Sequence, residues 1–140
     1  MIAGPLAPLP PAQQTAIGPD DAGEPLVSEI VVSFPFGSAM LTAAARASID
    51  AAASGDGIRR IDIRGRTDNV GPPAANDLLA RQRAAAVAQY LRARHPHLAG
   101  AEVKVDGRGV CCYATENDTP EGRARNRRVE VAFWRVPSDL

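Results

Sequence analysis

The sequence predicts an α/β fold, more closely an α+β sandwich, in which two main helices cover one face of a mixed sheet of about four strands. Four short segments alternate apolar and polar side chains, with the period of two that places one face of a strand in a core. Two longer segments repeat their apolar side chains with the helical period instead. The order is β-α-β-α-β-β, and helices between strands favour parallel pairs with right-handed crossovers. We expect the second face of the sheet to be partly solvated, with Arg128 and Glu130 on it.

The first half of the chain predicts a strand, a helix and a second strand. The segment 26–36 alternates throughout, and the segment 58–65 places two isoleucines on one side. Between them, the stretch 42–55 predicts a short helix, for which Thr42 is a suitable N-cap and Gly55 a suitable C-terminal stop. The residues expected on one face of the first strand are Leu26, Ser28, Ile30, Val32, Phe34 and Phe36.

The second half predicts a longer helix and two more strands. A turn-rich loop over 66–76 leads into an amphipathic helix over 76–95. A strand follows over 101–109, and then a loop with one helical turn over 119–125. The last strand covers 127–134.

The length of 140 residues fits one domain with some additional chain. Residues 1–24 are rich in proline, glycine and alanine without any period, which predicts a flexible arm or linker. The domain itself is expected over 25–136, with a tail over 137–140.

Composition argues against several classes of partner. Sixteen basic and sixteen acidic residues balance, and aromatics make up 4%, so we expect no nucleic-acid partner. No apolar run approaches the roughly 18 residues that cross a bilayer, so we expect no direct membrane insertion. The opening 14 residues lack a basic region and an unbroken apolar run, so we expect any export signal to lie outside this sequence.

The residues that most often carry chemistry are scarce. Cys111 and Cys112 are adjacent, and the preferred interpretation is two small side chains packing in a loop, with a disulfide between neighbours as the alternative. His95 and His97 are the only histidines, and they fall at a helix end, so we expect neither a metal nor a cofactor. No catalytic triad is visible, and an ionised Asp68 beside an arginine would be a poor general acid. We therefore expect no enzyme.

Arg83 is the residue that departs from its pattern. On a helical wheel it falls in the middle of the apolar stripe of its helix, with Asn76 almost directly above it. A buried guanidinium needs an anion or several acceptors, and Asp68 in the preceding loop is a candidate partner. Two interpretations follow: an internal ion pair that fixes the loop, or two ends of a site for a zwitterion, in which Arg83 binds a carboxylate and Asp68 an ammonium. The helical wheel alone favours the internal pair.

Three motifs change this preference. Gly65–Gly71 reads GRTDNVG, Asn76–Ala84 reads NDLLARQRA, and Gly122–Glu130 reads GRARNRRVE. In this order and spacing they resemble the OmpA-like peptidoglycan-binding domain of the OmpA, Pal and MotB group, over roughly residues 28–134. The sequence departs from the family pattern at Arg66, where histidine is typical, and at Ala80, where serine is typical.

The resemblance implies a domain that binds peptidoglycan non-covalently, through the meso-diaminopimelate of its stem peptide, and anchors an envelope protein or assembly to the cell wall. Matched by motif position, Asp68 and Arg83 would bind the D-centre of this residue. Asn76 and Arg127 would support them, and Thr67 is a weaker candidate, as is the backbone near Phe36. The resemblance also implies a periplasmic or cell-envelope location, and it leaves open a dimer or larger assembly. The alternative is a protein-interaction or structural domain on the same fold, with no affinity for the wall.

Overall fold

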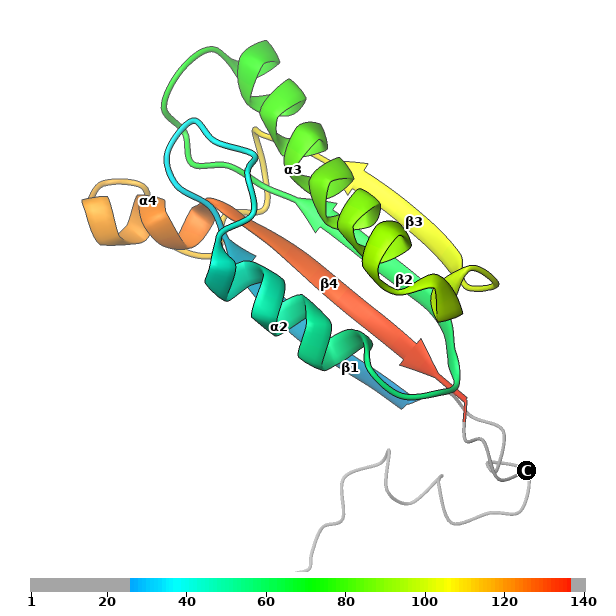
Figure 1. Ribbon diagram of the computed structural model, residues 1–140. Helices are drawn as coiled ribbons and strands as arrows, with labels where there is room; N and C mark the ends of the chain where they lie inside the picture. The colour runs from blue at the N-terminus through cyan, green and yellow to red at the C-terminus, as the bar shows by residue number, and fades with distance from the viewer. Residues whose placement is uncertain (1–25, 137–140) are drawn as a thin grey trace, which may run out of the picture.

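The computed structural model describes residues 26–136, which form a four-stranded sheet and three α-helices (Figure 1). The predicted arm over 1–24 and tail over 137–140 lie outside the described residues. In chain order the elements are β1 (Leu26–Ser33), α2 (Ala43–Ala53), β2 (Ile58–Gly65), α3 (Pro73–Arg94), the 3-10 helix η3 (Pro96–Leu98), β3 (Glu102–Gly107), α4 (Pro120–Asn126) and β4 (Arg128–Arg135).

The sheet is mixed, with strand order β1-β4-β2-β3. β2 and β3 are parallel and are connected through α3, as expected for strands joined by a helix. β4, the last strand, enters the middle of the sheet and pairs antiparallel with both β1 and β2. The predicted fold of about four strands with two main helices is therefore confirmed.

The core lies between the sheet and the helices α2 and α3, which cover the same face of it (Figure 1). Alternating residues of β2 and β4 point into this core, and the seam of α2 meets them with Ile49. The fully buried apolar side chains of this contact include Ile49, Ile61, Ile63, Val87, Val129, Val131 and Phe133. Packing of these side chains fixes how α2 and α3 lie on the sheet.

Two element boundaries differ from the sequence prediction. β1 ends at Ser33, and the amide of Phe34 donates to the carbonyl of Arg127 at 3.0 Å. Pro35 has no N–H to continue the ladder, so the chain turns away, and Phe36 is 65% exposed instead of lying in the core. α3 begins at Pro73, three residues before the expected start, because a proline in the first turn loses no intrahelical hydrogen bond.

The position of Arg128 differs from the sequence prediction. The strand pattern predicts that Arg128 lies on a solvated sheet face, but its side chain is buried, with 5% exposed. Its guanidinium donates to the Glu130 carboxylate at 2.8 Å and to the Cys112 carbonyl at 2.7 Å. The loop that follows β3 covers this position. The strand pattern alone cannot predict such a contact between distant segments.

Close contact with glycines positions α3 on the sheet. A Cβ at Gly65 would meet the Ala80 carbonyl, and a Cβ at Gly107 would meet the backbone of Arg81. A Cβ at Gly109 would meet the backbone of Asn76. The first half of α3 therefore lies directly against the carboxyl ends of β2 and β3, and this brings its polar residues next to the loop that follows β2.

Candidate functional site

Arg83 lies on the buried face of α3, as the helical wheel predicts, and is 0% exposed. Its guanidinium donates three hydrogen bonds to backbone carbonyls: Nε to Ser38 at 2.8 Å, Nη1 to Arg66 at 3.0 Å and Nη2 to Pro35 at 3.0 Å. Arg83 thereby ties the loop after β1 to the loop after β2. A guanidinium has five N–H groups, so two remain for another acceptor.

The charge of Arg83 is maintained at neutral pH. Burial lowers the pKa of Arg83 to about 10, the nearby Asp68 carboxylate opposes this change, and the positive charge of Arg127 adds to it. The guanidinium is therefore a buried cation balanced mainly by carbonyl dipoles.

Asp68 forms no direct ion pair with Arg83 among the described residues. Its Oδ2 lies 3.3 Å from Nη1 of Arg127, and its Oδ1 accepts from the amide of Val70 at 3.0 Å. The second of these contacts is the side-chain turn typical of aspartate in a loop. The direct Asp68–Arg83 pair of the structural interpretation is therefore wrong: the ion-pair partner of Asp68 is Arg127.

Arg127 comes from the C-cap of α4, where the chain enters β4. Its Nε donates to the Phe34 carbonyl at 3.1 Å, and its Nη1 lies 3.3 Å from the Asp68 carboxylate. Asn76 lies in the first turn of α3 and is 7% exposed. Its side chain has no hydrogen bond within residues 26–136, so its amide is available to a ligand.

These four residues line one small cavity of about 120 Å³. The lining consists of Phe36, Gly37, Asp68, Val70, Gly71, Ala75, Asn76, Leu79, Arg83 and Arg127. Two cations, one carboxylate and one amide thus line the same small cavity at the N-terminal end of α3. This combination suits a small centre that carries both a negative and a positive group.

Thr67, the weaker candidate, does not line this cavity. It is 1% exposed, and its hydroxyl lies 2.7 Å from the Asp68 carbonyl and 3.0 Å from the Gly109 carbonyl. Arg66 is also buried, and its Nη1 lies 3.3 Å from the Asp106 carboxylate. Both residues hold the loop that presents Asp68.

The loop 34–41 is the part of the site that sequence reasoning described least. Two of its carbonyls, those of Pro35 and Ser38, accept from Arg83, and Phe36 lines the cavity. Backbone acceptors have no sequence signature. Pro35, which has no N–H to donate to a strand ladder, is the one sequence signal that this segment leaves the sheet.

Cys111 and Cys112 form a disulfide between neighbours, the alternative rather than the preferred interpretation. Cys112 has a φ of 63°, and its carbonyl is the acceptor for the buried Arg128. Within residues 26–136, no group of three or more histidine, cysteine, aspartate or glutamate side chains is placed to hold a metal. In the same range, no helix is long and apolar enough to span a bilayer.

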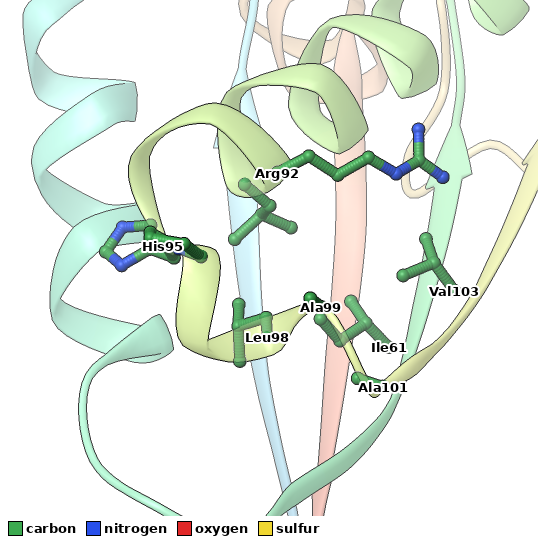
Figure 2. A pocket seen from close by; sticks show the side chains of 9 residues that line it. Ile61, Arg92, His95, Leu98, Ala99, Ala101 and Val103 are labelled. Carbon is green, nitrogen blue, oxygen red and sulfur yellow. The ribbon is translucent and has the colours of Figure 1, made fainter.

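A larger hollow of about 380 Å³ lies at the opposite end of α3 (Figure 2). Its lining is mostly apolar, and Arg92 and His95 are its polar members. The ring of His95 is already bonded, with Nε2 2.8 Å from Oδ1 of Asp50. Without a carboxylate in its lining, this hollow lacks a group to bind an ammonium, so the charged cavity is the better candidate for the predicted site.

Comparisons with known proteins identify the family of the chain. The sequence model of the OmpA family matches residues 33–127. The chain is 47% identical to the peptidoglycan-binding protein ArfA of Mycobacterium tuberculosis over 72 residues, which are 51% of this chain and 22% of ArfA. It is 33% identical to outer membrane protein A of Bordetella avium over 132 residues, which are 88% of this chain and 64% of that protein.

Solved structures share the fold. The cell wall anchor of the T6SS from Pseudomonas aeruginosa superposes with a TM-score of 0.62 at 22% identity, covering 87% of this chain and 93% of the anchor. The chain spans about a fifth of the length of the ArfA proteins that it matches. The match to the family model covers more than half of the chain, with all three motifs at least partly inside it, and the chain therefore belongs to the OmpA family.

Proposed function

We propose that this domain binds peptidoglycan non-covalently through the meso-diaminopimelate of the stem peptide. The observation that carries the proposal is the cavity in which Asp68, Asn76, Arg83 and Arg127 meet. The free D-centre of diaminopimelate carries a carboxylate and an ammonium on one carbon. Two cations and one carboxylate around a small space match that pair of charges.

In this proposal the ligand carboxylate is bound by the two N–H groups of Arg83 that the carbonyls leave unused. Asp68 and the Asn76 amide oxygen accept from the ammonium. Arg83 is 0% exposed, so the ligand enters by displacing the loop at Phe36 and Gly37. Gly37 has a φ of 68°, and nothing lies within 4 Å of the place where its Cβ would be, so this side of the cavity has room to move.

Relatives support the same class of function. One is named as a peptidoglycan-binding protein, and a structure of the same fold is described as a cell wall anchor. We infer that the chain acts in the cell envelope as a non-catalytic anchor, attaching a larger protein or assembly to the wall.

A second function has an observation in its favour. Arg83 already uses three N–H groups on carbonyls, which is what a purely structural arginine would do. In that case the domain would be a protein-interaction or structural module on the same fold, with no affinity for the wall.

Calorimetry separates the two functions. The ligand is a soluble muropeptide with meso-diaminopimelate, and the control ligand carries lysine, which lacks the second carboxylate. Asp68→Asn keeps the shape and the acceptor for Val70 but removes the charge, and Asp56→Asn is the matched variant at an exposed position. We expect wild type and Asp56→Asn to bind, Asp68→Asn to bind at least about tenfold more weakly, and the lysine ligand to bind weakly to all. No binding by folded wild type would support the structural module instead.

A further inference from the structure

A second hollow lies beside the charged cavity, on the other side of the loop that follows β1. Its volume is about 390 Å³, and it is lined by Ser33, Phe34, Pro35, Thr42, Ala124, Arg125 and Arg127. Arg127 belongs to both linings, and the lining passes from Pro35 in this hollow to Phe36 in the cavity. Figure 1 shows this loop in cyan and α4 in orange, both at the same end of the sheet as the start of α3. The two spaces are therefore neighbours.

The charge of this hollow is positive and unbalanced. Arg127 is held by the Phe34 carbonyl and the Asp68 carboxylate. Arg125 is exposed, and its side chain makes neither a hydrogen bond nor an ion pair with any other residue in the described range 26–136. No aspartate or glutamate is part of the lining, and the hydroxyls of Ser33 and Thr42 add neutral hydrogen-bonding groups. An anion placed here meets one uncommitted arginine and no acidic side chain.

We propose that this hollow binds a second carboxylate of the stem peptide, with Arg125 as its contact residue. The proposal rests on the proposed function, in which the cavity holds the D-centre of diaminopimelate. A stem peptide bound there has two further carboxylates on the same chain. The nearer is the L-centre carboxylate at the other end of the diaminopimelate side chain, free when the peptide ends at that residue, and the farther is the α-carboxylate of the γ-linked D-glutamate that precedes diaminopimelate. A branched ligand of this kind spans two neighbouring hollows that share one wall.

We expect Arg125 to contribute modestly to the affinity for the stem peptide because its side chain is exposed. Ion pairs at solvent-exposed positions change affinity by about two- to fivefold, and salt screens them. Arg125 thus tunes which stem peptides bind well, whereas Asp68 and Arg83 decide whether any binds.

The test uses three tripeptide stems with meso-diaminopimelate. One has both further carboxylates free, one has the D-glutamate α-carboxylate amidated, and one has the L-centre carboxylate amidated. Affinity of each is measured by calorimetry at low salt for wild type, Arg125→Gln and Arg92→Gln, the last being an exposed arginine at the far end of α3.

We expect wild type to lose about two- to fivefold in affinity for one of the amidated stems, which identifies the carboxylate. Arg125→Gln should bind the free stem as weakly as wild type binds that amidated stem, with no further loss on amidation, and Arg92→Gln should behave as wild type. Equal affinity of wild type for all three stems overturns the subsite but leaves the proposed function standing, as does an amidation effect that persists in Arg125→Gln. Failure of wild type to bind any stem overturns both.

Discussion

Replacing Arg83 with methionine tests whether the guanidinium holds the two loops together. Methionine is unbranched and of similar length, so it fills the space but donates no hydrogen bond. Three charge-assisted bonds to the carbonyls of Pro35, Ser38 and Arg66 are lost, at about 2 kcal/mol each. The replacement also removes a buried charge. Burial lowers the pKa of Arg83 to about 10, so keeping the guanidinium charged in the folded state costs about 3 kcal/mol, which the methionine variant regains. The net expectation is a loss of about 3 kcal/mol in the free energy of unfolding.

The assay is urea denaturation followed by circular dichroism, with thermal unfolding as a second measurement. A loss of this size should lower the Tm by about 10–20 °C for a domain of this length. Arg92→Met, on the same helix but exposed, is the matched control and should change stability by less than about 0.5 kcal/mol. If Arg83→Met unfolds within about 1 kcal/mol of wild type, the three carbonyl contacts do not stabilise the fold, and the reasoning is refuted.

Three further predictions concern stability away from the cavity. Gly65→Ala should cost about 1–3 kcal/mol by urea denaturation, because its Cβ would overlap the Ala80 carbonyl. Burial opposes ionisation of Glu130, but its arginine partners outweigh this and lower its pKa, so its stabilisation is present above pH 4.5 and is lost as pH falls below that value. Glu130→Gln should accordingly show a smaller drop in Tm between about pH 5 and about pH 2. Among variants without the disulfide, Cys111→Ser with Cys112→Gly should be more stable than Cys111→Ser with Cys112→Ser by about 0.5–1 kcal/mol, because φ at position 112 is 63°.

Each of these has a result that would count against it. Gly100→Ala is the control for the glycine contact, since nothing lies within 4 Å of its Cβ position, and equal effects of the two substitutions would remove the packing argument. Identical pH profiles of Glu130→Gln and wild type would show that the carboxylate is not stabilised by its arginines. Equal stability of the two cysteine double variants would show that the loop relaxes to negative φ once the disulfide is absent.

Much of the fold follows from local patterns. Alternation places the strands because successive side chains point to opposite faces, and the helical period places Arg83 on the buried face of α3. Thr42 caps its helix as expected, with its Oγ1 accepting from the Ala45 amide at 3.1 Å. The motifs then bring Asp68 and Arg83 to neighbouring positions, because one loop joins the end of β2 to the start of α3.

Arg83 can be identified from the amino-acid sequence as a buried cation that needs acceptors, because periodicity fixes which way a helical side chain points. The partners that satisfy it were decided by tertiary structure alone: carbonyls of two loops take three N–H groups, and Asp68 pairs with Arg127 from the far end of the chain. Every residue carries a carbonyl, so the sequence does not mark which ones a guanidinium will meet. The same holds for the burial of Arg128, which depends on a loop folding over it. Contacts between segments distant in sequence depend on how the sheet and helices pack, and only the assembled fold specifies them.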